Sequence, residues 1–557
     1  MSAAARPPAR LLRLAPVLLL VLFLVWLVGY PLLLTLLGSF SDPGGSGWSL
    51  ASWRAFAASG EEWLALWRSF LLSLLSVLLS AAVGVPLAFV FERLDFPGRR
   101  TLGALVALPV ALPPLVGVIA FLFLFGESGF LARGLMLAFG LETAPWRLAG
   151  PGAILLVHTY SMYVYFYLFV RAALARLDAS LLEAAAVLGA SRARTFFKVI
   201  LPQLRPALLG ASLLTFMTSL GSFSAPYIFG GGYRVMTTQI LASKLGGEVG
   251  LAQVEAILLA VVALLALFLI RFFQGRDLAI SSHGLAPERR RVEAPILRAL
   301  SALLGYGLAT FLLLPHLTLL LISFVPLGSW TTELLPPQLA LDNYRQLLAE
   351  PQRLQPILNS LWMAAAATAG AVVLGLLTAR QALRRGGLWG GLLEGLIALP
   401  WAIPGTVFAL ALSLTFSQNQ PALLRFVWVG TPIILPIAYL VRCLPMTGRS
   451  SLAGLRQVDP SLEEAAAILG ASPLRTMWKV ILPRVRPAIQ AGMGLAFITA
   501  LGDYVASIVL YTYETRPISI EIASALRVQE FGIAAAYGVL LMILSSAAFL
   551  AWGRGDA

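Results

Sequence analysis

The chain has 557 residues, of which 59% are hydrophobic and only 12% are charged. Soluble proteins usually have about one quarter charged residues, so this composition excludes an ordinary soluble protein. The formal net charge is +14, but the basic residues lie between apolar segments rather than in one patch. This distribution follows the positive-inside rule and argues against a nucleic-acid partner. The single cysteine, Cys443, excludes an intrachain disulfide and a cysteine-based metal site.

The first apolar segment, at about residues 14–37, follows Arg6, Arg10 and Arg13. It is long enough to cross a bilayer and no clear small-x-small cleavage site follows it, so we interpret it as an uncleaved helix rather than a signal peptide. With eleven further apolar segments it predicts an all-α polytopic membrane protein of about 12 transmembrane helices, six in each half. The further segments fall at about 67–91, 103–126, 151–172, 206–228, 252–272, 297–325, 358–381, 390–416, 430–448, 487–511 and 530–552.

The predicted orientation places both termini in the cytoplasm. With this orientation about 29 of the 40 Lys and Arg residues fall on the cytoplasmic side. Because six is an even number, the two halves enter the membrane in the same direction and form two parallel repeats. We therefore divide the chain into a first half at 1–275, a basic cytoplasmic linker at 276–296 and a second half at 297–557.

Short motifs support the internal repeat. ALPVALPP at 107–114 corresponds to ALPWAIPG at 398–405, and FMTSLGSFSA at 216–225 corresponds to FITALGDYVA at 497–506. The strongest match is a polar segment, EAAAVLGASRARTFFKVILP in the first half and EAAAILGASPLRTMWKVILP in the second. Its two copies lie in the predicted cytoplasmic loops at 178–206 and 459–487, at an offset of about 281 residues.

The residues of each copy predict a helix, a glycine turn and a second helix. Ser180 and Ser461 stand three residues before a glutamate, so we expect capping boxes there. The following glycines suit the left-handed residue that ends a helix, the later serines suit caps of the second helix, and Pro473 suits its first position. A duplicated polar loop in an apolar protein indicates an external partner.

This pattern resembles the "EAA" loop of permease subunits of bacterial ATP-binding-cassette importers, and both copies match without a gap. The resemblance implies the type I importer permease fold and a coupling helix that sits in a groove of an ATP-binding subunit. Ordinary amphipathic interfacial helices are the alternative, but they do not explain two copies at matching positions. The residues to which the coupling role is carried over are Glu183, Ala184, Ala185, Gly189, Ser191, Glu464, Ala465, Ala466, Gly470 and Ser472.

The resemblance also implies two copies of an ATP-binding-cassette subunit, an extracytoplasmic solute-binding protein and location in the bacterial inner membrane. The sequence has no G-x-x-x-x-G-K-[ST] phosphate loop, so we expect ATP hydrolysis by the partner and no enzymatic activity here. His158, His283 and His316 are scattered without metal-ligand spacing. We therefore expect no catalytic residue, metal site or cofactor.

The translocation path is expected between the two halves. Asp503 is the main candidate, because an intramembrane carboxylate usually faces a cavity or a partner. It lies about 24 Å along its helix from Pro487, at 1.5 Å per residue. The alternative is a carboxylate that reaches external water or caps a local helix break. Further candidates in matching segments are Ser222, Phe223, Ser224, Tyr227 and Tyr504.

The fused arrangement resembles the permeases of Fe(III) and thiamine importers, and the segment 504–527 resembles that of proteins labelled iron permeases. Fe(III) is therefore the expected solute, with thiamine, polyamine, phosphonate or a sulfate-like anion as alternatives. A second class is a 12-helix secondary transporter of the major facilitator type, because RLDFPGRR at 93–100 superficially resembles its signature. Phe91 and Phe96 depart from that signature, and the paired loops stay unexplained. A third class is a membrane receptor or scaffold without transport.

Overall fold

The computed structural model describes residues 7–42, 47–107, 109, 113–274, 290–291, 295–329, 334–419 and 426–552. This part is almost entirely helical, and its one sheet is a parallel pair, β1 (Leu94–Asp95) with β2 (Arg290–Arg291). The linker expected at 276–296 lies outside the described residues except for 290–291 and 295–296.

Most long helices follow the predicted segments, but only residues 114–125 of the segment predicted at 103–126 belong to a long helix, α6. The first span combines α1 (Pro7–Leu24), η1 (Val25–Gly29) and α2 (Tyr30–Gly38). The other long helices of the first half are α4 (Gly60–Arg93), α6 (Pro114–Phe125), α8 (Gly150–Leu174), α11 (Leu201–Leu220) and α14 (Val249–Gln274). Those of the second half are α15 (Pro295–Ile322), α17 (Pro351–Arg385), α18 (Gly387–Ala402), α19 (Gly405–Phe416), α20 (Ile434–Arg456), α23 (Leu482–Leu501) and α26 (Phe531–Trp552).

Shorter helices occupy the connections, and several have a counterpart in the other half. They are α3 (Ala51–Ala58), α5 (Arg99–Val106), α7 (Phe130–Phe139), α12 (Ser224–Phe229), α13 (Met236–Leu245), α16 (Asp342–Ala349), α24 (Val505–Leu510) and α25 (Ile518–Arg527). In both halves the helix that follows the duplicated loop breaks near its end, between α11 and α12 and between α23 and α24.

By length and composition, nine helices of the described part can cross a membrane, or ten if α18 and α19, bent by 105° at their break, form one span. The predicted count of twelve also includes α20 and α23. These two helices are long enough to span but less apolar, because α20 contains Arg442, Arg449 and Arg456 and α23 contains Arg484 and Arg486.

Each half packs its long helices through a glycine at the same place. Gly84 is the twenty-fifth residue of α4, and Gly375 is the twenty-fifth residue of α17. A Cβ at Gly84 would lie 2.3 Å from the backbone oxygen of Tyr163 in α8, and one at Gly375 would lie 2.8 Å from the backbone nitrogen of Gly448 in α20. Small residues let helix backbones approach closely where the hydrophobic effect is weak, so these contacts fix α4 on α8 and α17 on α20.

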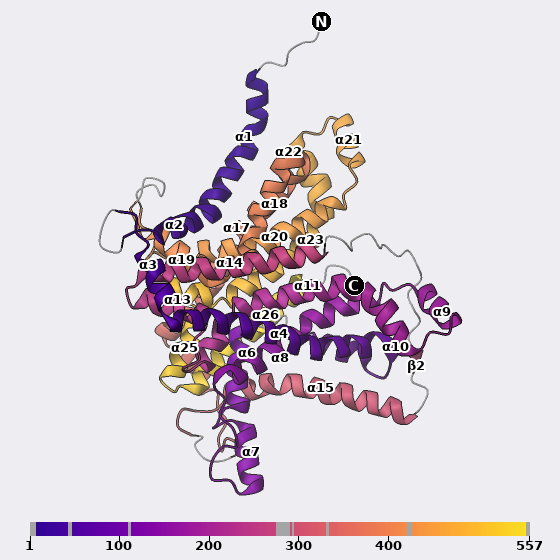
Figure 1. The fold of residues 1–557 in the computed structure, drawn as a ribbon. Coiled ribbons are helices and arrows are strands. Elements are labelled where there is room, and N and C mark those ends of the chain that lie inside the picture. Colours follow the sequence, from indigo (N-terminus) through magenta and orange to yellow (C-terminus); the bar gives the residue numbers. More distant parts are fainter. Residues whose placement is uncertain are drawn as a thin grey trace.

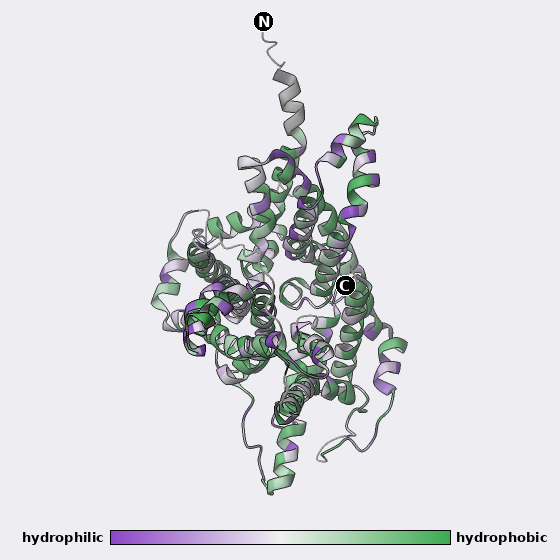
Figure 2. Cartoon of the chain, turned by 90° about the vertical axis from the view of Figure 1, so that its right-hand side faces the viewer, coloured by the Kyte–Doolittle hydropathy of each residue, from purple (hydrophilic) through white to green (hydrophobic). Residues whose placement is uncertain are grey.

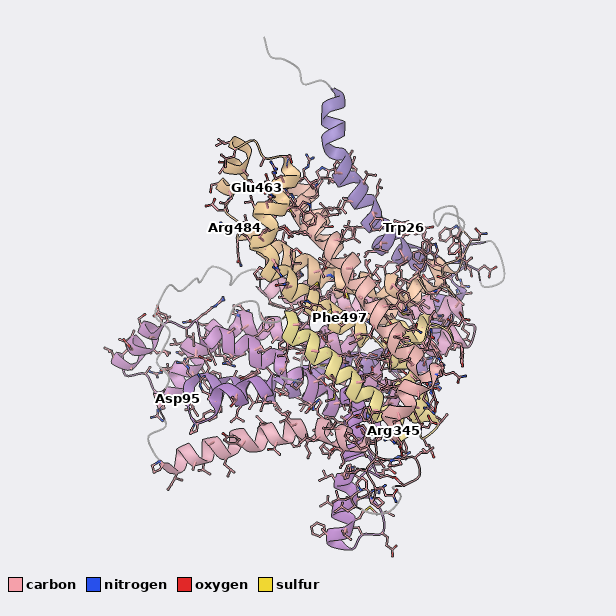
Figure 3. All side chains as sticks on the ribbon, turned by 180° about the vertical axis from the view of Figure 1, so that it is seen from behind. Trp26, Asp95, Arg345, Glu463, Arg484 and Phe497 are labelled. Carbon is pink, nitrogen blue, oxygen red and sulfur yellow. The ribbon has the colours of Figure 1, made fainter. Side chains whose placement is uncertain are left out.

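Figure 1 shows the long helices running between two ends of the molecule. The two copies of the duplicated loop, labelled α9 and α21, project at one end, whereas α3, α13 and α25 gather at the other. Hydrophobic residues cover most of the helical ribbon (Figure 2). Glu463 and Arg484 lie toward the α21 end and Arg345 toward the opposite end (Figure 3). This arrangement agrees with a membrane protein whose duplicated loops share one side.

Candidate functional site

Both copies of the duplicated loop fold as a helix, a glycine turn and a second helix. The first copy contains α9 (Ala179–Val187) and α10 (Arg192–Thr195), and the second contains α21 (Ser461–Ile468) and α22 (Pro473–Thr476). Gly189 and Gly470 have φ angles of +69° and +76°, so the predicted left-handed residues are confirmed.

The second helix of each copy begins as predicted. Ser191 accepts a hydrogen bond from the backbone N–H of Arg194, and Ser472 accepts one from that of Arg475, both at 3.3 Å. Pro473 occupies the first helical position of α22. These caps satisfy N–H groups that the helix itself leaves without partners.

The predicted capping boxes on Ser180 and Ser461 are wrong. The capping side chain is an aspartate two residues earlier: Oδ1 of Asp178 accepts from the N–H of Ser180, and Oδ1 of Asp459 accepts from that of Ser461, both at 2.9 Å. Asp178 is the extended residue before α9, whereas Ser180 is already helical and has no free cap position. The backbone hydrogen bond from Ser461 holds the pKa of Asp459 below its usual value.

A π-helical turn follows the second helix within each copy, η3 (Phe196–Ile200) after α10 and η5 (Met477–Ile481) after α22. Each lies directly before the next long helix, α11 or α23. The extra residue of a π-turn is costly and is often found at functional sites. A π-turn at equivalent places connects each loop to its next long helix in the same way. The residue pattern did not predict these π-turns.

Apolar side chains form the exposed tip of each loop. Val187 and Leu188 are 88% and 84% exposed, and Ile468 and Leu469 are both 86% exposed. Of the residues assigned to coupling, only Ala185 and Ala466 are buried, so the others face outward. Two equivalent apolar tips at one end of a protein indicate a surface that a partner covers.

Asp503 lies in the break between α23 and α24 and is buried. Its Oδ2 forms an ion pair with Nη1 of Arg442 in α20 at 2.8 Å, and its Oδ1 accepts from the N–H of Ala506 at 2.8 Å. Its backbone oxygen accepts hydrogen bonds from the hydroxyls of Ser507 and Ser519. In this conformation Asp503 therefore neutralises a cation and caps α24, which is the alternative role that the sequence left open.

The corresponding break of the first half is held by a histidine and serine hydroxyls. Nε2 of His158 in α8 is 2.9 Å from Oγ of Ser222, and Nδ1 is 2.9 Å from Oγ of Ser76 and 3.1 Å from Oγ of Ser219. Ser224, at the start of α12, is also buried. The two halves thus hold equivalent breaks with different chemistry, and His158 was not among the predicted site residues.

Three of the predicted path residues come together as an aromatic cluster between the halves. Phe223 and Tyr227 stack at a centroid distance of 5.2 Å, and Tyr504 contacts them at 5.8 Å and 6.1 Å respectively. Phe223 and Tyr227 belong to the break of the first half, whereas Tyr504 belongs to that of the second. The rings fill the interface between the two halves at this level.

A cation from each half crosses the same interface. Nζ of Lys244 at the end of α13 donates to the backbone oxygen of Val509 in α24 at 2.9 Å. In return, Arg527 at the end of α25 hydrogen-bonds the hydroxyl of Tyr227 and lies over its ring. Burial lowers the pKa of Lys244 to about 8. These reciprocal contacts link each half to the short helix after the other half's break.

The fold and the paired segments define a multi-pass membrane protein built from two equivalent halves. The family model described as binding-protein-dependent transport system inner membrane component matches residues 80–276 and again 371–553. Together these matches cover more than half of the chain, so the chain belongs to this family of transport components. The predicted importer permease with two fused halves is confirmed.

Curated relatives have related descriptions. A probable ABC transporter permease of Sinorhizobium fredii is 29% identical over 87% of this chain and 86% of its own length. A ferric transport system permease of Actinobacillus pleuropneumoniae is 28% identical over 81% of this chain and 65% of its own length. A molybdenum transport system permease of Escherichia coli is 36% identical, but over 37% of this chain and 91% of its own length. The last relative thus has the length of about one half.

Proposed function

We propose that the chain forms the translocation path of an importer and couples it to a separate ATPase through α9 and α21. The observation that supports this most directly is the pair of exposed apolar tips, Val187 with Leu188 and Ile468 with Leu469. Two equivalent tips match two copies of one ATP-binding subunit. A solute-binding protein delivers the solute on the opposite, extracytoplasmic side, and both termini lie in the cytoplasm.

The proposed path runs between the halves, and the aromatic cluster of Phe223, Tyr227 and Tyr504 closes it in this conformation. The cluster lies where helices from the two halves meet, and Lys244 and Arg527 bridge the halves beside it. ATP binding closes the two ATPase subunits on each other, moves α9 and α21 with them and separates the two halves at the cluster. Ser222, Ser224 and Asp503, which lie in the same two breaks, are further candidates to line the path.

Accessibility of a thiol tests this path. Phe223→Cys in a Cys443→Ser background should be protected from a membrane-impermeant thiol reagent without nucleotide and become reactive when the complex is trapped with ATP and vanadate. Leu245→Cys serves as the control, because Leu245 is exposed at the end of α13 and should react in both states. Equal reactivity of Phe223→Cys in both states would contradict a gate at this position.

The proposed solute is Fe(III), supported by the description of the Actinobacillus relative as a ferric transport permease. A molybdenum permease matches 37% of the chain at higher identity, so an oxyanion is the second candidate. Thiamine, polyamine and phosphonate are the remaining candidate solutes. Uptake of labelled Fe(III), molybdate, thiamine and a polyamine is compared in cells with and without the gene. Loss of iron uptake alone, restored by the intact gene, supports the assignment, whereas a defect in another solute replaces it.

Co-purification separates the importer from the secondary transporter. An importer permease isolated in mild detergent should retain an ATPase subunit, and solute uptake should require ATP. Uptake driven by an ion gradient without that subunit would instead support a secondary transporter. The absence of any uptake defect on deletion would support a receptor or scaffold.

A further inference from the structure

Two buried glutamates of the first half face each other without a cation. Glu62 at the start of α4 is 4% exposed, and Glu255 in α14 is 0% exposed. Both carboxyl groups bind the same face of α13, Glu62 through Gln239 and Glu255 through Ser243 one helical turn further on, so they lie close together. Within the described residues neither carboxyl group forms an ion pair. Two adjacent buried charges of one sign are strongly unfavourable, so the pair needs something between them.

The hydrogen bonds around the pair leave too few donors. Nε2 of Gln239 donates to Oε1 of Glu62 at 2.7 Å, and the hydroxyl of Ser243 donates to Oε1 of Glu255 at 2.6 Å. Both donors lie on one face of α13, four residues apart. Oε2 of each glutamate and Oε1 of Gln239 are buried and receive no donor from the described part of the chain. One proton shared by the two carboxyl groups would satisfy two of these three atoms, Oε2 of Glu62 and Oε2 of Glu255.

The other elements that pack against α14 supply no compensating cation. The only charged residue of α3, Arg54, is exposed. The only charged residue of α11, Arg205, is its fifth residue, near the end of α11 that follows the duplicated loop. α2 and α19 contain no charged residue, and Glu394 of α18 pairs with Arg456. The acidic neighbour Glu248, just before α14, adds negative charge.

On α13 the charged residue is Lys244, whose amine contacts the second half instead. On α4 the cation nearest along the helix is Arg68, which lies over the ring of Tyr233, and Glu61 pairs with Arg234. The remaining charges of α4, Glu92 and Arg93, lie at its far end. The cation of α14 itself, Arg271, lies in its last turn, so none of the described cations faces the Glu62 and Glu255 pair.

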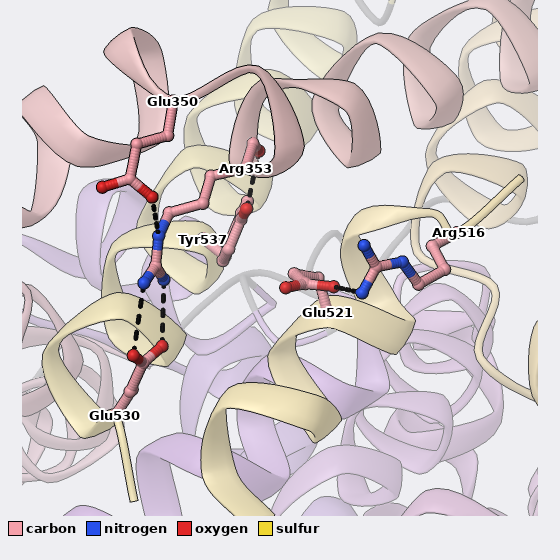
Figure 4. Close-up of polar contacts among 6 residues, drawn as sticks. All are labelled: Glu350, Arg353, Arg516, Glu521, Glu530 and Tyr537. Atoms are coloured by element: carbon pink, nitrogen blue, oxygen red, sulfur yellow. Dashed lines mark hydrogen bonds and ion pairs between the residues drawn. The ribbon is translucent and has the colours of Figure 1, made fainter. Parts of the chain in front are cut away.

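The equivalent site of the second half contains a cation that compensates its acidic residues. Equivalent positions can be matched by counting from the start of each helix. Glu62 is the third residue of α4 and Arg353 the third of α17. Gln239 is the fourth residue of α13 and Glu521 the fourth of α25, while Glu255 is the seventh residue of α14 and Tyr537 the seventh of α26. Arg353 binds Glu530 through two hydrogen bonds of 2.9 Å and 3.2 Å, and Tyr537 donates to the backbone oxygen of Arg353 at 2.6 Å (Figure 4). Where the second half has an arginine and a tyrosine, the first half has two glutamates.

We propose that Glu62 and Glu255 form a protonation site in which one carboxylic acid donates its hydrogen to the other group's carboxylate. The shared proton supplies the missing donor and removes one of the two negative charges. It also keeps α13 attached to α4 and α14. Thr237 of α13 donates to the backbone oxygen of Ser222 in the first-half break, so the protonated pair supports the helix that positions this break.

Infrared spectroscopy of the purified protein tests the site directly. A carbonyl band of a protonated carboxylic acid should be present at neutral pH and shift in D₂O. Both Glu62→Gln and Glu255→Gln should remove this band, because a single remaining carboxylate no longer shares a proton. Glu530→Gln is the control at the compensated second-half site and should leave the band unchanged. A wild-type spectrum without the band, or a band that survives both substitutions, would overturn the proposal.

The pH dependence of stability gives a second readout. The native pair binds one proton that separate glutamates of the unfolded chain have released at neutral pH, so unfolding releases a proton. Stability from the pair is therefore present at low pH and is lost as the pH rises. The unfolding equilibrium constant of the wild type should rise about tenfold more per pH unit than that of Glu255→Gln.

A bound cation is the competing occupant of the pair. It predicts no acid band, a lower melting temperature with chelator, and loss of this chelator effect in both glutamine variants; that result would overturn the shared proton. If Glu255→Gln does not fold, Glu62→Gln and the wild-type spectrum still decide between the two. None of these readouts depends on transport, so they test the site separately from the proposed function.

Discussion

Arg442 of α20 and Asp503 of the second-half break form an ion pair at 2.8 Å. The equivalent break of the first half is held from α8 by a hydrogen bond between His158 and Ser222 at 2.9 Å. In both halves the helix that precedes the coupling segment thus holds the break that follows it. Because the carboxylate is 2% exposed and the guanidinium 27% exposed, water screens this pair only in part.

Removing one partner of this pair should destabilise the protein. Asp503→Asn leaves Arg442 without its counter-charge, and we expect a loss of roughly 2 kcal/mol in the free energy of unfolding, below the full value for completely buried pairs. The double variant Arg442→Gln/Asp503→Asn should recover part of this loss. Thermal unfolding in detergent measures both effects. Arg345→Gln, which breaks an exposed pair with Asp342, is the control and should change stability by less than about 0.5 kcal/mol.

Asp503→Asn also tests whether the ion pair contributes to transport as well as to stability. We expect Asp503→Asn to reduce solute uptake more than ATPase activity measured without transport, because the break lies beside the aromatic cluster. Unchanged stability together with unchanged uptake and ATPase activity would show that the pair contributes to neither property.

The coupling segments could be predicted largely from local residues, including the serine caps of their second helices, whereas the caps of their first helices could not. Gly189 and Gly470 adopt the predicted conformation because a helix followed by a tight turn requires a left-handed residue. The capping boxes failed because Asp178 and Asp459, two residues before the serines, compete for the same N–H groups. Two plausible caps so close in sequence cannot be separated by spacing alone.

The polar contacts inside the membrane could not be predicted, because their partners come from distant helices. Asp503 was found from its unusual position in an apolar segment, but nothing near it indicated Arg442. The pair of Glu62 and Glu255 depends on how α13 sits between α4 and α14, which is a property of the packing. The two halves differ in charge at equivalent places, so the charged contacts of one half could not be inferred from the residues of the other.

Replacement of the turn glycines should depend on backbone conformation rather than on space. A Cβ at Gly189 or Gly470 would meet no atom within 4 Å, but a β-branched residue at positive φ costs about 1–2 kcal/mol. The double variant with Val at both positions should lose transport while remaining inserted in the membrane. Asn at both positions is the matched control and should retain more activity, because Asn tolerates this conformation. Normal uptake by the valine variant would contradict the coupling role.

The apolar tips should decide binding of the ATPase. Replacing Val187, Leu188, Ile468 and Leu469 with Ser removes apolar surface that only a partner can cover, so we expect the ATPase to be lost on purification. The permease itself should stay folded, because these side chains have few contacts within the chain. Leu137→Ser in α7, where the leucine is 72% exposed, is the control and should retain the ATPase. Retention of the partner by the quadruple variant would show that the subunits meet elsewhere.

Lys244 gives a pH-dependent readout of the closed interface. The chain has three lysines, Lys198, Lys244 and Lys479, so a mass spectrum distinguishes each labelled amine. Because burial lowers the pKa of Lys244 to about 8, its amine loses a proton between pH 7 and 9 and its acylation rate should rise with a midpoint near pH 8. The unfolded amine keeps its proton to about pH 10.4, so this group favours the native state more as the pH rises from 8 to 10.4. Opening of the interface with ATP and vanadate should hydrate Lys244 and move the midpoint upward. A midpoint that stays the same in the trapped state would show that Lys244 does not leave Val509 during the cycle.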